Sequence, residues 1–138
     1  MVEKIIFGGF HSDKRGVVSF NNDFDVSDIK RIYTIENDSI NLIRGWQGHG
    51  IERRWFSALI GSFEIKLIKI TNWKAPNKKS KSNSYILKSK SFDILCIPKG
   101  YISSIKALEE KSKLLVMSDY HLNEVNDEYR FDSNYFTI

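Results

Sequence analysis

Residues 43–56 hold the densest group of side chains able to do chemistry. Arginine, glutamine, histidine and glutamate follow one another there as Arg44, Gln47, His49, Glu52 and Arg54. Histidine exchanges a proton near neutral pH, and arginine binds anions through paired N–H donors. Proton transfer beside a ketone needs a base of this kind and a group that stabilises the enolate. The segment therefore offers both kinds of group, with His49 as the leading proton acceptor.

The spacing within this segment decides which side chains act together. Successive side chains of a β-strand point to opposite faces, so Gln47 and His49 share one face. The other face then carries Arg44, Trp46 and Gly48. Polar side chains that face the inside of a barrel need a wet cavity. We expect Gln47 and His49 to face such a cavity, with the pKa of His49 near its ordinary value of about 6.5.

Two other segments carry polar groups that a ligand can contact. Arg15 precedes Gly16, so the backbone there can approach an anion, although a plain turn is the simpler interpretation of this pair. Residues 97–104 form a rigid turn that leads into a strand carrying Ser103. Neither segment is specific enough to define a site by itself.

Most of the chain has the apolar pattern of β-strands. Residues 63–70 alternate apolar and polar side chains, which is typical of a strand with one buried and one wet face. Helix signals are weak, and the best of them predicts a turn near residues 25–29. Many short strands with turns between them indicate a barrel or a sandwich. The predicted strands cover residues 29–35, 39–44, 55–60, 63–70, 84–87, 94–97, 104–108 and 113–117.

Size and composition favour a single globular domain over residues 1–138. The formal charge is +4, from 21 basic and 17 acidic residues, a mild excess that favours an anionic small molecule. The basic residues form no stripe with aromatic residues between them, so no nucleic acid is expected as a partner. No apolar run approaches the ~20 residues that span a bilayer, so no membrane is expected either. The single cysteine, Cys96, indicates a reducing compartment, and we expect a cytoplasmic protein.

Two stretches lie outside the predicted strands. Residues 73–83 are basic and polar, which predicts an exposed loop, with a phosphate clamp as the alternative. Residues 123–138 mix acidic and aromatic side chains, and we expect them to pack on the barrel or on a partner subunit. Exposed sheet edges invite pairing, and residues 4–7 and this tail are candidates for exchange between two copies. We therefore expect a homodimer.

Several motifs, in order and spacing, resemble those of one group of cupins. They are Lys30-Arg31-Ile32-Tyr33, Arg44-Gly45 followed by His49, then Gly61, Ile97-Pro98 followed by Gly100-Tyr101, and Ser118-Asp119-Tyr120. The set is similar to motifs of the dTDP-4-dehydrorhamnose 3,5-epimerases and of the WxcM-like dTDP-sugar 3,4-ketoisomerases. The resemblance implies an all-β fold, a single cupin (jelly-roll) β-barrel, with the binding site in the barrel mouth.

The resemblance also implies an enzyme. The implied substrate is a nucleotide sugar, a dTDP-4-keto-6-deoxyhexose, and the implied reaction moves a proton beside the ketone without a metal or another cofactor. The pathway implied is the synthesis of surface-polysaccharide precursors. The implied catalytic residues are His49, His121 and Tyr120. The implied substrate-binding residues are Arg15, Arg31, Tyr33, Arg44, Gln47, Arg54 and Ser103.

The sequence departs from these families at two histidines. Gln47 stands at the first barrel histidine and Ser103 at the later histidine of the epimerases. An amide is no general base, so Gln47 is expected to hold a substrate hydroxyl or carbonyl as a neutral donor. The candidates for the base are then His49, His121, Glu52 and Tyr33. One imidazole and at most one carboxylate make a poor transition-metal site, so no metal is expected.

Two other functions remain open from the sequence. One is a cupin that binds a sugar or a nucleotide sugar without catalysis, having lost its base at Gln47. The other is a small structural partner of a glycosyltransferase or an acyltransferase. Exchange of a carbon-bound sugar proton with solvent separates the enzyme from both alternatives.

Overall fold

The structure, a computed structural model, describes residues 2–137 and is built from short β-strands. Within this range no residue is helical, and no helix long and apolar enough to cross a membrane is present. Gly61 and Gly100 occupy turns with φ angles of 72° and 90°, which glycine adopts without strain. The strands are β1 (Lys4–Ile6), β2 (Gly9–Asp13), β3 (Gly16–Phe20), β4 (Arg31–Ile35), β5 (Ile43–His49), β6 (Arg54–Ile60), β7 (Ser62–Lys69), β8 (Asn83–Lys88), β9 (Ile94–Ile97), β10 (Tyr101–Ala107), β11 (Lys113–Ser118) and β12 (Tyr129–Arg130).

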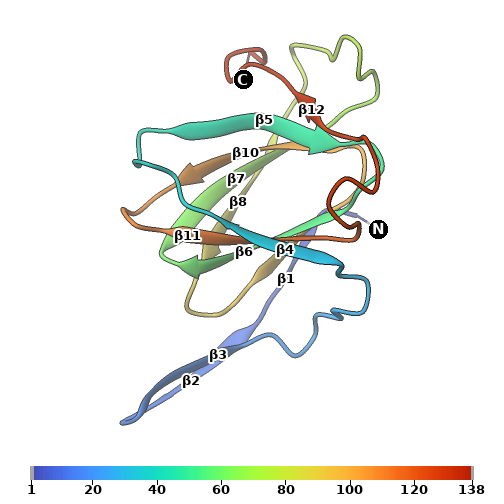
Figure 1. Ribbon diagram of the computed structural model, residues 1–138. Coiled ribbons are helices and arrows are strands. Elements are labelled where there is room, and N and C mark those ends of the chain that lie inside the picture. The colour runs from blue at the N-terminus through green and yellow to red at the C-terminus, as the bar shows by residue number, and fades with distance from the viewer. Residues whose placement is uncertain (1, 138) are drawn as a thin grey trace.

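Ten of these strands form two five-stranded antiparallel sheets that pack face to face (Figure 1). One sheet has the order β1-β9-β6-β11-β4, and the other has the order β12-β5-β10-β7-β8. Most neighbouring strands come from distant parts of the chain, and only β7 and β8 are consecutive, so the connections cross between the sheets, as in a jelly roll. Buried side chains of both sheets, such as Phe56 and Phe63, meet in one core.

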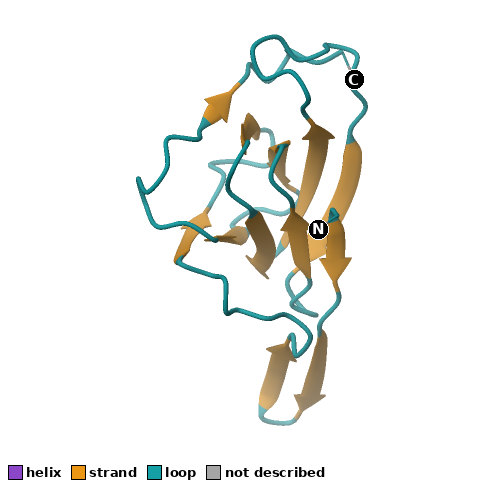
Figure 2. Ribbon diagram, turned by 90° about the vertical axis from the view of Figure 1, so that its right-hand side faces the viewer, coloured by secondary structure: helices purple, strands orange, loops and turns teal. Residues whose placement is uncertain are grey.

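The strands β2 and β3 form a separate hairpin that projects away from the two sheets (Figures 1 and 2). We call residues 9–20 the arm. Its apolar side chains Phe10, Val17 and Val18 are exposed. A two-stranded ribbon has little stability by itself, and exposed apolar side chains add to this cost. The sequence pattern around Arg15 predicted a turn but not the hairpin that contains it.

The strand predicted over residues 63–70 from alternating side chains is confirmed as β7. Its apolar side chains Phe63 and Ile65 are fully buried in the core between the sheets. The strand predicted over residues 39–44 is wrong in its first half. There the Ser39 hydroxyl oxygen accepts a hydrogen bond from the backbone N–H of Asn41, which closes a turn, and β5 begins only at Ile43.

A bulge in β5 changes the face on which Arg44 lies. Gln47 pairs with Ser103 of β10, whereas Arg44 pairs with Ile105. Three residues of β5 therefore span the length of two residues in β10, and the extra residue reverses the alternation. Arg44 lies on the same side as Gln47, not on the opposite side as simple alternation predicted.

The C-terminal tail packs against the outer face of the second sheet, which confirms the first of its two expected positions. Phe136 is buried there and meets the ring of Trp46 edge to face at a centroid distance of 5.4 Å. The hydroxyl of Tyr135 donates to the carbonyl oxygen of Pro76 at 2.7 Å. The backbone N–H of Thr137 donates to the carbonyl oxygen of Lys78 at 2.8 Å. The loop between β7 and β8 is therefore attached to the tail.

The outer face of the first sheet is also apolar. Trp55, Cys96 and Met117 are buried there beneath the loop that carries Phe24 and Ile29. Cys96 is thus a buried thiol, as its apolar neighbours in the sequence predicted. The cover is incomplete, because Ile32 and Leu59 remain exposed on this face.

Candidate active site

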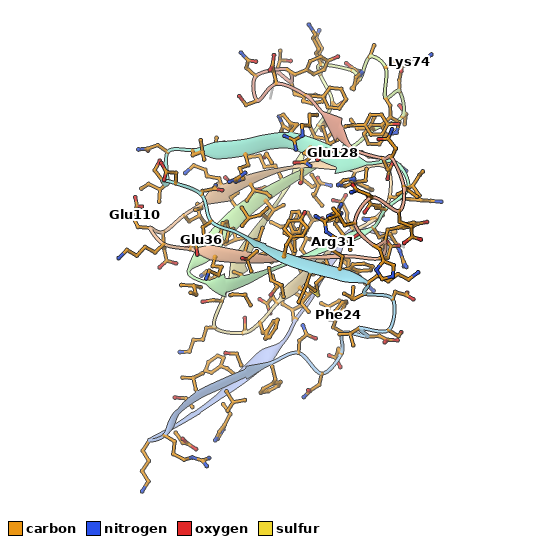
Figure 3. All side chains as sticks on the ribbon, in the orientation of Figure 1. Phe24, Arg31, Glu36, Lys74, Glu110 and Glu128 are labelled. Carbon is orange, nitrogen blue, oxygen red and sulfur yellow. The ribbon has the colours of Figure 1, made fainter. Side chains whose placement is uncertain are left out.

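A cavity of about 260 Å³ lies between the two sheets and receives side chains from β4, β5, β6, β9, β10 and β12. Apolar side chains such as Phe56 and Ile97 form part of its wall. Figure 3 shows the side chains of both sheets directed into the space between them. The polar side chains that line the cavity are Tyr33, Arg44, Gln47, His49, Arg54, Tyr101, Ser103 and Arg130.

His49 lies at the end of β5, and its two ring nitrogens have different surroundings. Its Nδ1 atom lies 3.0 Å from the backbone carbonyl oxygen of Asp127 and 3.4 Å from Oε2 of Glu52. Both oxygens accept hydrogen bonds, so Nδ1 carries the proton. The other nitrogen, Nε2, is then the unprotonated one. His49 lines the cavity, so this ring offers a proton acceptor to a bound molecule.

Burial lowers the pKa of His49 below its ordinary value of 6.5, and the positive charge of Arg54 acts in the same direction. The carboxylate of Glu52 and the contacts with Asp127 raise this pKa but are the weaker causes. The expectation of an ordinary pKa is wrong, because His49 is only 9% exposed. A lowered pKa keeps the imidazole neutral at pH 7, and it can therefore accept a proton.

Glu52 and Arg54 form a buried ion pair beside His49. Oε1 of Glu52 accepts hydrogen bonds from Nη2 of Arg54 at 3.1 Å and from Oγ of Ser118 at 2.9 Å. Nη1 of Arg54 donates to the Tyr33 hydroxyl oxygen at 2.9 Å. Nε of Arg54 is buried without a hydrogen-bond partner among residues 2–137. The pair therefore leaves a positively charged donor next to the cavity.

Asp127 fixes the loop that follows β5. Its carboxylate accepts hydrogen bonds from the backbone N–H groups of Gly50, Ile51 and Glu52, at 2.9, 2.8 and 2.8 Å. Ligand atoms of His49, Glu52 and Asp127 lie within 4.8 Å of one another, a spacing that also suits a metal ion. Both carboxylates already accept hydrogen bonds within the protein, and these bonds account for the clustering.

Six of the ten residues that the sequence assigned to the site line this cavity. They are Tyr33, Arg44, Gln47, His49, Arg54 and Ser103. They come together because β4, β5, β6 and β10 present alternate side chains to the space between the sheets. The Nε–H of Arg44 donates to Oδ1 of Asn37 at 3.0 Å, which holds this arginine at the edge of β5.

The other four lie outside the cavity of the single chain. Arg31 stacks on the Tyr33 ring at 4.6 Å from its centroid. Arg15 pairs with Asp13 at 2.8 Å near the tip of the arm. Tyr120 and His121 follow β11 in a loop, where the Tyr120 backbone N–H donates to Oγ of Ser118 at 3.2 Å and the His121 side chain is exposed.

Sequence reasoning missed three contributors to the site. Tyr101 lines the cavity, and strand alternation was able to find it, because it lies two residues before Ser103. Burial and the nearby Glu3 carboxylate raise the pKa of Tyr101, so its hydroxyl stays protonated at neutral pH. Asp127 and Arg130 carried no comparable signal, since their stretch has no strand-like pattern.

Comparisons with known proteins identify the fold. No family model and no curated protein matches the chain. A solved 3,4-ketoisomerase from Helicobacter canadensis is 25% identical and superposes with a TM-score of 0.72, over 98% of this chain and 95% of that one. The chain has the cupin fold of the nucleotide-sugar ketoisomerases and epimerases. The jelly-roll cupin predicted from the motifs is therefore confirmed.

Two further solved structures are similar to this cupin. One is a histidine-to-asparagine variant of a 3,4-ketoisomerase from Thermoanaerobacterium thermosaccharolyticum in complex with TDP-4-keto-6-deoxyglucose. It is 24% identical, with a TM-score of 0.71 over 96% of this chain and 90% of that one. The other is a dTDP-4-dehydrorhamnose 3,5-epimerase from Bacillus anthracis with TDP and PPi bound. It is 14% identical, with a TM-score of 0.72 over 91% of this chain and 76% of that one.

Proposed function

We propose that this cupin is a nucleotide-sugar ketoisomerase or epimerase that moves a proton beside the ketone of a dTDP-4-keto-6-deoxyhexose. The observation that carries the proposal is the neutral imidazole of His49 in the cavity wall, with Nδ1 hydrogen-bonded and Nε2 unprotonated. The 25% identity to a 3,4-ketoisomerase over nearly the full length of both chains supports the same reaction class.

In this reaction Nε2 of His49 removes a proton from the carbon next to the ketone. The electrons of the broken C–H bond form a C=C bond, and the ketone oxygen becomes an enolate oxygen. Arg54 and Tyr33 stand beside the cavity as the cationic group and the hydroxyl that stabilise this charge. The imidazolium formed on His49 is stabilised by Glu52, whose Oε2 lies 3.4 Å from Nδ1. In a ketoisomerisation the proton is delivered to the former ketone carbon, while the hydroxyl of the neighbouring carbon passes its proton to the enolate oxygen and becomes the new ketone. In an epimerisation a donor on the opposite face returns a proton to the first carbon, and His49 keeps the proton that it removed.

The size and charge of the cavity suit a sugar ring rather than a whole nucleotide sugar. Ligand pockets of drug-sized molecules have volumes of about 300–1,000 Å³, and this cavity has about 260 Å³. We place the hexose inside, and the diphosphate at the mouth beside the guanidinium groups of Arg44 and Arg130.

The arm provides the argument for a homodimer. Phe10, Val17 and Val18 on the arm and Ile32 on the outer face of the first sheet are exposed apolar side chains. If two copies exchange arms, the apolar side chains of each arm pack against the apolar outer face of the partner's first sheet, and both become buried. In such a dimer Arg15, which lies outside its own cavity, binds the diphosphate at the partner's cavity mouth. The buried single thiol and the anionic substrate fit a cytoplasmic step in surface-polysaccharide precursor synthesis.

Deuterium incorporation tests the function directly. The protein is incubated in D2O with dTDP-4-keto-6-deoxyglucose, and deuterium at the sugar carbons is measured by NMR. We expect incorporation beside the ketone in wild type and its loss in His49→Asn, with dTDP binding retained. His11→Asn, which changes an exposed histidine of the arm, is the matched control. Full incorporation in His49→Asn would move the base to His121, and no incorporation in wild type would favour a binding protein.

A further inference from the structure

The side-chain amide of Gln47 is hydrogen-bonded to the segment between β11 and β12. Strand β12 pairs with β5, and Arg130 is the register partner of Gln47. Nε2 of Gln47 donates a hydrogen bond to Oε1 of Glu128. The same carboxylate oxygen accepts a second hydrogen bond, at 3.0 Å, from Nη2 of Arg130. Glu128 stands beside β5 in Figure 3.

This contact settles which way round the Gln47 amide is held. An ionised carboxylate accepts hydrogen bonds and donates none, so the NH2 end of the amide must face Glu128. The carbonyl oxygen, Oε1, is then the other end of the group. Within residues 2–137 no hydrogen-bond donor contacts this oxygen, and Gln47 lines the cavity. The cavity wall therefore carries a fixed, free acceptor at this position.

The free acceptor lies close to the proposed base. Gln47 and His49 are two residues apart on one strand and face the same side, which places their Cα atoms roughly 6–7 Å apart. We therefore place the oxygen substituent of the sugar carbon that gives its proton to His49 within reach of Gln47. A hydroxyl on that carbon can donate to Oε1 of Gln47, whereas a carbonyl oxygen or a hydrogen atom cannot.

We propose that Glu128 determines substrate specificity by holding Gln47 as an acceptor, so that the site selects a sugar with a hydroxyl on the carbon beside its ketone. The inference rests on the proposed function and names the feature of the substrate that the site recognises. It reverses the expectation from sequence, in which Gln47 is a donor. Glu128 acts through Gln47 and is therefore a positioning residue.

The test compares two ligands and three proteins. The ligands are dTDP-4-keto-6-deoxyglucose and its 3-deoxy analogue, which carries hydrogen in place of the hydroxyl. The proteins are wild type, Glu128→Gln and the control Glu110→Gln, which makes the same chemical change in the exposed turn between β10 and β11. Affinities for both ligands and for dTDP alone are measured by calorimetry. In Glu128→Gln the new amide offers both a donor and an acceptor. It can bond to the NH2 group or to the carbonyl oxygen of Gln47, so the orientation of Gln47 is no longer fixed.

We expect wild type and Glu110→Gln to prefer the hydroxylated ligand by about 10–100-fold, because an acceptor that the bound sugar shields from water without giving it a donor is costly. Glu128→Gln should reduce the wild-type preference about tenfold. Its affinity for dTDP alone should stay or rise, because Arg130 loses its acidic partner. An unchanged preference in Glu128→Gln, or no preference in wild type, would overturn the inference and leave the proposed function standing. If wild type binds neither sugar nucleotide, the proposed function fails and the inference fails with it.

A second measurement needs no substrate. The side-chain NH2 protons of Gln47 give two NMR signals, and the proton donated to Glu128 should exchange slowly with solvent. Glu128→Gln should speed this exchange at least several-fold, and Glu110→Gln should leave it unchanged. Equal exchange in all three proteins would overturn the fixed orientation of Gln47 on which the inference depends.

Discussion

Nδ1 of His49 and the backbone carbonyl oxygen of Asp127 lie 3.0 Å apart, although the two residues are 78 positions apart in the chain. The carbonyl fixes the tautomer of the proposed base, and the carboxylate of the same aspartate holds the loop that follows it. Stability and proton transfer therefore depend on one residue outside the ten barrel strands.

Replacing Asp127 should lower the free energy of unfolding. Asp127→Ala leaves the backbone N–H groups of residues 50–52 without their acceptor, and we expect a loss of about 2–4 kcal/mol. Urea unfolding monitored by tryptophan fluorescence measures it. Asp23→Ala, at an exposed aspartate of the loop between β3 and β4, should change stability by less than about 0.5 kcal/mol. Equal stability of the two variants would contradict the role given to Asp127.

The activity should persist at pH values below 6.5. Burial and Arg54 lower the pKa of His49, so its imidazole stays neutral, and competent as a base, until the pH falls through this lowered value. The rate of proton exchange should therefore decline only on the acid side of 6.5. Removing the positive charge in Arg54→Gln should raise the pKa of His49 and move the decline to higher pH.

The titration of His49 can be followed without substrate. The sequence contains three histidines, His11, His49 and His121, so their ring NMR signals are separable by single substitutions. The signal of His49 should titrate below 6.5 in wild type and at higher pH in Arg54→Gln. A wild-type midpoint at or above 6.5 would contradict the assigned environment of His49.

Gln47→His should be tolerated by the fold. Gln47 is only partly buried, and a histidine ring N–H can donate to Glu128 in place of the amide. We expect the free energy of unfolding to change by less than about 1 kcal/mol, measured by urea unfolding. Trp46→Ala, at the buried neighbouring position, should cost about 3–5 kcal/mol and shows the scale of a disruptive change. A loss above about 2 kcal/mol in Gln47→His would mean that Gln47 is required for folding.

Exchanged arms predict complementation between two inactive variants. Each site of the dimer takes His49 from one subunit and Arg15 from the other. Arg15→Ala and His49→Asn should therefore each lose most of the activity. A mixed dimer rebuilds one site that contains Arg15 and His49 from different copies. Co-refolding an equal mixture should then restore about a quarter of wild-type activity if subunits pair at random. Light scattering should give a dimer mass at micromolar concentration. A monomer mass, or no recovery after mixing, would remove the exchanged-arm dimer.

The sequence predicted those parts of the site that depend on local pattern. Alternation along β5 was enough to place Gln47 and His49 on one inward face, because neighbouring side chains of a strand always diverge. The bulge that turns Arg44 inward was not predictable, since it arises from the pairing of β5 with β10. Nor were the contacts of Glu128, because β12 has two residues and no pattern of its own.

Residues 127–130 perform four different tasks in consecutive positions: Asp127 closes a loop, Glu128 orients an amide, Tyr129 stacks on Trp73, and Arg130 lines the cavity. Because the four residues are consecutive, the position of each side chain depends on that of its neighbours. Deleting one residue inside this stretch would move every later side chain to the opposite face. A change in the length of this stretch would therefore remove several contacts of the site at once, whereas a substitution would remove one.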